Sequence, residues 1–229
     1  MSLWIYQLLT GLSFGMLLFI FSAGLALIYG VMRILNLAHG AFYAIAAWVP
    51  TLFIRVHGWS ARDVGVVYGL ITLVLGMSGV VTGGWWASRL RRAGYRDANW
   101  RVAFVDIALL VPCAILAPLP ESPVVSMTLL ALTVFLSTLP YGVAAAALQD
   151  ITPNQLRAQA SAFYLFGLGL LGLGLGPASA GFATDWVFGD PLAVGRSIAL
   201  VVAVAGPLAI LLLAWGWGGY RRLVQEPPR

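Results

Sequence analysis

The stretch Gly83-Gly84-Trp85-Trp86-Ala87-Ser88-Arg89-Leu90-Arg91-Arg92-Ala93-Gly94 joins two long apolar segments of the chain. Residues 64–88 carry no charge, and residues 102–119 carry only Asp106. Between them, residues 89–101 hold five arginines against a single aspartate. Short arginine-rich loops between membrane spans stay on the cytoplasmic side of the bilayer. We therefore predict that residues 89–101 form a cytoplasmic loop and that both flanking segments cross the membrane.

The composition of the chain is typical of an integral membrane protein. Of its 229 residues, 61% are hydrophobic and 9% are charged, and the mean hydropathy is +0.92. A soluble domain carries about 25% charged residues. This chain has too few polar side chains to cover a water-facing surface, so we expect its main partner to be the lipid bilayer.

Charge and cysteine content exclude several kinds of chemistry. All 13 basic residues are arginine, and without lysine the chain has neither a Walker-type phosphate loop nor a Schiff-base site. The one cysteine, Cys113, forms no intrachain disulfide, and His39 and His57 lack metal-ligand spacing. The arginines lie in short loops between apolar segments, which indicates a topology signal rather than a nucleic-acid surface. We expect no enzyme activity, no cofactor, no metal and no nucleic-acid partner.

Further apolar segments are long enough to cross a hydrocarbon core of about 30 Å. The predicted spans are residues 1–32, 64–88, 102–119, 124–148, 158–184 and 198–220. The shorter stretch 41–54, interrupted by Pro50, is either a seventh span or a re-entrant piece. These segments predict an all-α, polytopic membrane bundle of about six or seven transmembrane helices.

Local signals and loop charges refine this picture. Ser60, followed three residues later by Asp63, resembles a capping box that opens the next helix, and Pro140 with Gly142 predicts a kink. With residues 89–101 inside, the C-terminal tail also falls on the cytoplasmic side. We therefore predict a multi-pass protein of the inner membrane with a cytoplasmic C-terminus.

Three motifs carry a family resemblance. They are Gly83-Gly84 with Arg89, Arg91 and Arg92, then Gln149-Asp150-Ile151-Thr152-Pro153 with Arg157, and Gly174-Leu175-Gly176-Pro177. Through these motifs, residues 48–222 resemble the C-terminal half of a major facilitator superfamily transporter of the bacterial Spinster-like type. The resemblance implies secondary transport of a small organic solute by alternating access.

The resemblance also implies a cytoplasmic gate. Its candidate residues are Gly83, Gly84, Arg89, Arg91, Arg92, Asp150 and Arg157. For Asp150 and Arg157, the alternative is a pair of solvated loop charges. Ser88 stands where the family has an acid, which puts a charge-based gate at this loop in doubt, although its hydroxyl could cap a helix end.

The N-terminal part resembles a different family. Gly24-Leu25-Ala26-Leu27-Ile28-Tyr29-Gly30-Val31-Met32-Arg33, followed by Asn36-Leu37-Ala38-His39-Gly40, is similar to the opening of branched-chain amino-acid ABC transporter permeases. We therefore divide the chain into a permease-like segment at 1–47, a facilitator half at 48–222 and a cytoplasmic tail at 223–229.

These two resemblances imply three alternative functions. The first is facilitator-type transport. A facilitator has two six-helix halves, so a chain that forms one half would need a second half-bundle, most simply another copy of itself. The alternatives are an ABC permease subunit and a non-transporting fusion or truncation remnant that acts as a membrane scaffold.

Few residues are candidates for binding the solute. Asp106 is either a coupling carboxylate inside a span or an acid that reaches the membrane interface, if its helix begins near Arg101. Trp48 and Trp85 are weaker candidates for lining a substrate path. The glycine-rich segment lacks the lysine of a nucleotide loop, and we expect it to serve close helix packing and flexing. The residues concerned are Gly172, Gly174, Gly176 and Pro177.

Overall fold

The computed structural model describes residue 7 and residues 48–167 and 175–225. The chain divides into two compact units, Met1–His39 and Gly40–Arg229, and every described residue except Gln7 belongs to the second. The predictions for the permease-like segment before residue 48, and those for Gly172 and Gly174, lie outside the described residues.

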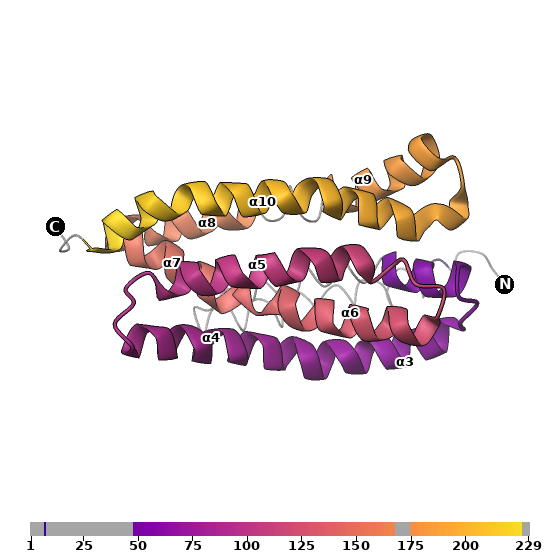
Figure 1. The fold of residues 1–229 in the computed structure, drawn as a ribbon, viewed down its shortest axis with the longest axis horizontal. Helices are drawn as coiled ribbons and strands as arrows, with labels where there is room; N and C mark the ends of the chain where they lie inside the picture. Colours follow the sequence, from indigo (N-terminus) through magenta and orange to yellow (C-terminus); the bar gives the residue numbers. More distant parts are fainter. Residues whose placement is uncertain (1–6, 8–47, 168–174, 226–229) are drawn as a thin grey trace. The chain divides into compact units, whose positions relative to one another are not determined.

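The described part of the second unit consists of helices joined by short loops, without a strand (Figure 1). Residues 48–55 are helical, and the α-helices that follow are α3 (Ala61–Ile71), α4 (Met77–Arg92), α5 (Ala98–Leu116), α6 (Pro123–Thr138), α7 (Pro140–Ile151), α8 (Arg157–Gly167), α9 (Gly176–Phe182) and α10 (Val194–Gln225). The described part also contains two π-helical segments, η2 (Thr72–Gly76) and η5 (Ala183–Phe188), and two 3₁₀ turns, η3 (Asn154–Leu156) and η6 (Pro191–Ala193). The all-α prediction is confirmed.

Four helices in the described residues are long and apolar enough to cross a membrane. They are Ala61–Arg92, Ala98–Leu116, Pro123–Ile151 and Pro191–Gln225. They confirm that the segments predicted at 64–88, 102–119, 124–148 and 198–220 form helices of membrane-spanning length and composition. The predicted span 158–184 corresponds to α8 and α9, which flank residues outside the described part. The described residues thus contain the helices of a multi-pass membrane protein.

The arginine-rich stretch is helical for longer than predicted. Arg89, Arg91 and Arg92 form the last turn of α4, so the connecting loop is only residues 93–97. Cations are favoured at a helix C-terminus, where they offset the partial negative charge of unpaired carbonyl groups. Gly94, with φ of +94°, then ends the helix in the left-handed conformation.

The backbone hydrogen bonds at this helix end form a Schellman motif. The Gly94 amide donates to the Arg91 carbonyl and the Tyr95 amide donates to the Leu90 carbonyl. The expectation that Ser88 caps a helix end is wrong, because its hydroxyl donates to the Gly84 carbonyl one turn earlier and the helix continues.

Other local predictions are confirmed. Ser60 is the N-cap of α3, accepts a hydrogen bond from the Asp63 amide and donates its hydroxyl to the Asp63 carboxylate. The kink predicted near Pro140 is a break between α6 and α7 at Leu139, since proline has no amide hydrogen to continue the helix.

Two glycines set how closely the helices pack. A Cβ at Gly83 would overlap the Leu139 carbonyl oxygen, and one at Gly79 would overlap the Phe135 carbonyl oxygen. The backbone of α4 therefore approaches the α6–α7 break directly. Gly84, by contrast, faces open space.

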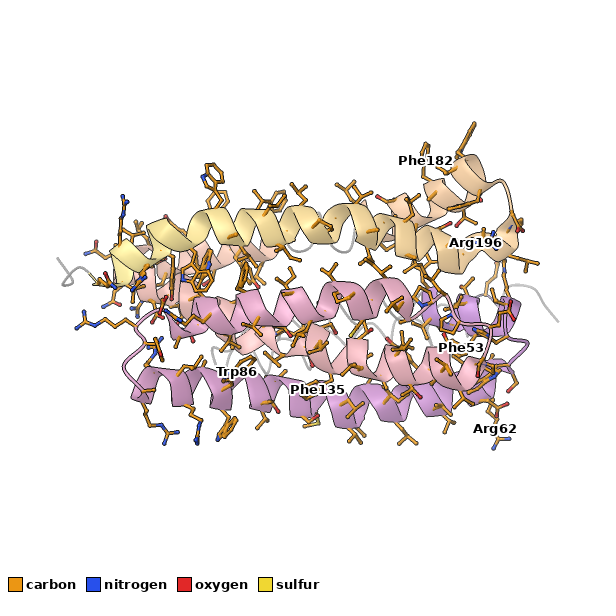
Figure 2. The ribbon with its side chains drawn as sticks, in the orientation of Figure 1. Phe53, Arg62, Trp86, Phe135, Phe182 and Arg196 are labelled. Carbon is orange, nitrogen blue, oxygen red and sulfur yellow. The ribbon has the colours of Figure 1, made fainter. Side chains whose placement is uncertain are left out.

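The interior of the unit contains two apolar clusters. The first lies around Phe53, which has no exposed surface; its buried members are Val49, Leu52, Phe53, Val64, Tyr68, Ala117, Met127, Leu130 and Val134. The second joins α4 and α5 to the α6–α7 break; its members are Ala87, Val102, Leu139 and Val143. Figure 2 shows Phe53 among the helices, with Arg62 and Arg196 toward the same end of the unit.

Large apolar side chains also cover the outside of the unit. Trp215, for example, is 85% exposed, and such a surface suits contact with lipid.

Candidate functional site

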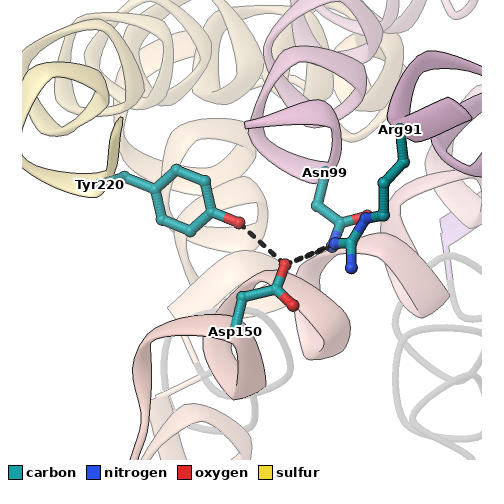
Figure 3. Close-up of polar contacts among 4 residues, drawn as sticks. All are labelled: Arg91, Asn99, Asp150 and Tyr220. Carbon is teal, nitrogen blue, oxygen red and sulfur yellow. Dashed lines mark hydrogen bonds and ion pairs between the residues drawn. The ribbon is translucent and has the colours of Figure 1, made fainter. Parts of the chain in front are cut away.

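A polar cluster lies at the end of the unit where α4 and α7 stop and α5 begins. We call this the arginine-rich end. Here the Oδ2 atom of Asp150 accepts three hydrogen bonds, as Figure 3 shows: from Arg91 Nη2 at 2.6 Å, Asn99 Nδ2 at 2.8 Å and the Tyr220 hydroxyl at 3.2 Å. These four residues, the Asp150 cluster, connect α7 to α4, α5 and α10.

The helix ends explain this arrangement. Asp150 is the penultimate residue of α7, where a negative charge is unfavourable beside unpaired carbonyl groups. Arg91, in the last turn of α4, supplies the compensating charge. Asn99 is the second residue of α5 and reaches the same carboxylate from the other side of the loop. One carboxylate oxygen thus accepts from three helices.

A second carboxylate lies beside the first, in the loop between α4 and α5. Asp97 Oδ1 accepts from Arg101 Nε at 2.8 Å, and Asp97 Oδ2 accepts from the Trp217 indole at 2.9 Å. Burial would raise the pKa of the Asp97 carboxyl, but the hydrogen bonds from Arg101 and Trp217 and the charge of Arg101 outweigh burial and lower that pKa. The Arg101 guanidinium also lies over the Tyr95 ring, 4.4 Å from its centroid. The Asp97 site, formed by Asp97, Arg101 and Trp217, stays ionised at neutral pH.

Aromatic contacts hold the last part of α10 against the start of α5. The Trp100 and Tyr220 rings stack with centroids 4.8 Å apart, and the Trp100 indole donates to the Leu213 carbonyl at 3.0 Å. A Cβ at Gly216 would lie 3.0 Å from the Trp100 ring, so glycine permits this approach. Trp100 therefore packs against α10 beside Tyr220 of the Asp150 cluster.

The predicted gate residues separate into two groups. Arg91 and Asp150, 59 positions apart, form an ion pair. Arg157 does not join them, because its Nε donates to the Thr152 carbonyl at 3.2 Å. Arg89 lies over the Trp85 ring, and Arg92 donates to the Ser88 carbonyl. Gly83 packs at the α6–α7 break, whereas Gly84 contacts no neighbouring helix there.

Sequence reasoning missed most partners of these carboxylates. Asn99, Tyr220, Asp97, Arg101 and Trp217 were not proposed as site residues. The sequence did contain one signal for these partners, at the end of α10, where Trp215, Trp217 and Tyr220 alternate with glycines. Tryptophan and tyrosine side chains donate hydrogen bonds to buried polar groups, so this segment could have been proposed as a source of donors.

The three candidates for solute binding lie in different surroundings. Asp106 is only 1% exposed. Its helix begins at Ala98, three residues before Arg101, and both interpretations of Asp106, as a coupling carboxylate and as an acid at the membrane interface, stay predictions. Trp85 is 56% exposed. The indole nitrogen of Trp48 is buried and has no hydrogen-bond partner within the part of the chain that the structure describes. No hydrogen bond, ion pair or ring contact joins these three residues in the described part of the chain.

The proline and glycine predicted to serve helix packing begin α9. Gly176 is its first residue and Pro177 its second, where a missing amide hydrogen costs nothing. Four residues further on, Gly181 lies beside the Trp48 ring. Whether these residues flex stays a prediction. Among the described residues, no group of three histidine, cysteine, aspartate or glutamate side chains could hold a metal ion.

Comparison with known proteins points to a membrane transporter. The chain is 31% identical over 191 residues to a protein of Mycolicibacterium smegmatis named an MFS-type efflux pump. The match covers 82% of this chain and 44% of that protein, so the chain spans less than half the length of this relative. No protein-family model matches the chain. Together with the membrane-length helices, this similarity supports a membrane transporter in general.

Proposed function

We propose that this chain forms one half of a secondary transporter of the major facilitator superfamily, which moves a small organic solute by alternating access. The observation that carries the proposal is the match to 44% of an MFS-type efflux pump in a chain with four membrane-length helices. The Spinster-like type, the inner membrane and the cytoplasmic position of the C-terminus belong to the same proposal. It includes no enzymatic step, cofactor or metal.

The Asp150 cluster is the cytoplasmic gate in this proposal. Alternating access requires one end of a bundle to open while the other closes. At the arginine-rich end, three donors from α4, α5 and α10 share one carboxylate oxygen. Arg91 is half-exposed, so water can replace its hydrogen bond at modest cost when the helices separate. A closed gate of this kind is reversible.

A central path needs a second half-bundle. Facilitators have two six-helix halves around such a path. We propose that a second copy of the chain supplies the other half. This part of the proposal does not depend on which solute is carried.

The mass of the full chain in mild detergent tests the homodimer. Light scattering with the detergent contribution subtracted should give twice the 24.4 kDa mass of the chain. A stable, homogeneous monomer would overturn the homodimer. It would leave two possibilities: a half that pairs with another chain, or a non-transporting scaffold.

Dye accumulation tests transport itself. Bacterial cells that lack their own efflux pumps and express the full chain are loaded with ethidium, a small organic cation. Expression should lower the ethidium accumulated, and Asp150→Asn should weaken that effect by altering the gate. Asp185→Asn is the matched control, because Asp185 is an exposed acid away from the Asp150 cluster. Equal accumulation with and without the protein, repeated over a panel of organic cations and anions, would contradict the proposal.

A further inference from the structure

Asp106 is a buried carboxyl that the proposed gate does not use. Only 1% of the residue is exposed, and its Oδ1 atom is buried without a hydrogen-bond partner among the described residues. The residue lies eight positions into α5, about 12 Å along the helix at 1.5 Å per residue. Asp106 therefore lies well within Ala98–Leu116, a helix that is long and apolar enough to cross a membrane.

The position of Asp106 on α5 follows from helical spacing. Val102 is four residues before it and Asn99 seven, so all three share one face of the helix. Val102 packs with Leu139 and Val143 at the α6–α7 break. Asp106 thus lies on the face that α5 turns toward α4 and α7, two turns from the residue that reaches Asp150.

No basic side chain in the described part of the chain compensates for an ionised Asp106. Among the helices that the structure describes, those packed against α5 are α4, α6, α7 and α10. Their titratable side chains, together with those at the start of α5 itself, are Arg89, Arg91, Arg92, Tyr141, Asp150, Arg196, Tyr220, Arg221, Arg222, Asp97 and Arg101. The charged side chains of this set lie at the helix ends, and α6 has no titratable side chain. Arg101, at the start of α5, is bound to Asp97. Of this set, only Tyr141, beside the α6–α7 break, lies in the middle of a membrane-length span, Pro123–Ile151, and its phenol is neutral when protonated.

An unpaired carboxylate in such surroundings is costly. Moving an isolated ionised carboxylate from water to an apolar interior costs far more than moving its protonated form. Ionisable groups inside membrane spans are accordingly rare and occur where they bind or relay something. A bound proton removes the charge without requiring a partner side chain.

We propose that Asp106 is a proton-binding site. Its carboxyl carries a proton while α5 is packed against α4 and α7, and releases that proton to water when those helices separate. Because Asn99 lies on the same face and donates to Asp150, opening of the Asp150 cluster and hydration of Asp106 involve the same movement of α5. In the setting of the proposed function, on which this last step rests, the proton is the coupled ion.

Infrared spectroscopy of the purified full chain in detergent tests the site without transport. A protonated carboxyl has a carbonyl stretching band that an ionised carboxylate lacks. At pH 7 the wild-type protein should show this band, Asp106→Asn should lose it, and Asp185→Asn should retain it. No protonated-carboxyl band in the wild-type protein at pH 7 would overturn the proposal, even if Asp106→Asn failed to fold. A band that persists unchanged in a folded Asp106→Asn protein would overturn it as well.

A second measurement separates this inference from the proposed function. In vesicles, the Asp106→Asn protein should no longer move ethidium in response to a pH gradient. It should still let ethidium cross the membrane from the side of higher to the side of lower ethidium concentration. If the wild-type protein shows the infrared band but moves neither ethidium nor any other member of the panel of organic ions, the proton site stands and the proposed transport is contradicted. Gradient-driven movement that survives Asp106→Asn would show that Asp106 does not couple the proton.

Discussion

Arg91 Nη2 lies 2.6 Å from Asp150 Oδ2, although 59 positions separate the two residues in the sequence. This ion pair ties the C-terminal ends of α4 and α7, two helix ends whose carbonyl groups both favour a nearby cation. The same carboxylate also accepts from α5 and α10. Loss of one donor should therefore weaken the cluster without dissolving it.

The Arg91–Asp150 pair should contribute little to stability. Because half of the Arg91 side chain is exposed, Arg91→Gln should lower the free energy of unfolding by at most about 1 kcal/mol. Thermal unfolding of Arg91→Gln, Asp150→Asn and the double variant would measure the coupling between them. A loss well above that limit would mean that the pair is shielded from water.

The two adjacent glycines of α4 should respond in opposite ways to the same change. Gly83→Val should destabilise the protein by about 1–3 kcal/mol, because its Cβ would overlap the Leu139 carbonyl. Gly84→Val is the matched control and should be nearly neutral, because that Cβ meets open space. Thermal unfolding in detergent measures both. Equal losses for the two variants would contradict the packing of α4 on the α6–α7 break.

The indole of Trp217 should matter more than that of its neighbour Trp215. Trp217→Phe keeps an aromatic ring but removes the donor to Asp97, which leaves a buried carboxylate oxygen short of a partner. We expect a loss of about 1–3 kcal/mol. Trp215→Phe, at an exposed position, should change stability by less than about 0.5 kcal/mol. A similar effect of both variants would argue against the Trp217–Asp97 hydrogen bond.

Asp97 should make the protein sensitive to acid. Its pKa is lowered in the folded protein, so its contribution to stability is present above the unfolded value of about 3.9 and is lost as pH falls through the lower folded value. Asp97→Asn should therefore be less stable than wild type at pH 7, and the difference should shrink below about pH 4. Unfolding temperatures of both proteins from pH 7 to pH 3 measure this. A difference that stays constant with pH would contradict the ionised Asp97.

Hydropathy predicted the spans because long uncharged segments have few alternatives to crossing a membrane. The ends of those spans were harder to predict, since arginines in a last helical turn and arginines in a loop give the same charge pattern. Gly94 was the available signal for where α4 ends. The partners of Asp150 depend on how α10 lies against α5, and Tyr220 is 70 residues away from Asp150. Local periodicity carries no information at that distance.

The π-helical turn η2 sets the phase of the helix that contains it. The buried residues of Ala61–Arg92 include Val64 and Tyr68 before the turn, and Gly79, Gly83 and Ala87 after it. In an unbroken α-helix, residues four positions apart differ in direction by about 40° around the helix axis, so a row of such residues gradually turns away from its neighbour. The π-helical turn has more residues per turn and rotates the following residues back. The buried residues before and after it therefore lie on one side of the helix. Removing one residue from Thr72–Gly76 would therefore leave two intact helical segments but rotate the glycines of α4 away from the α6–α7 break.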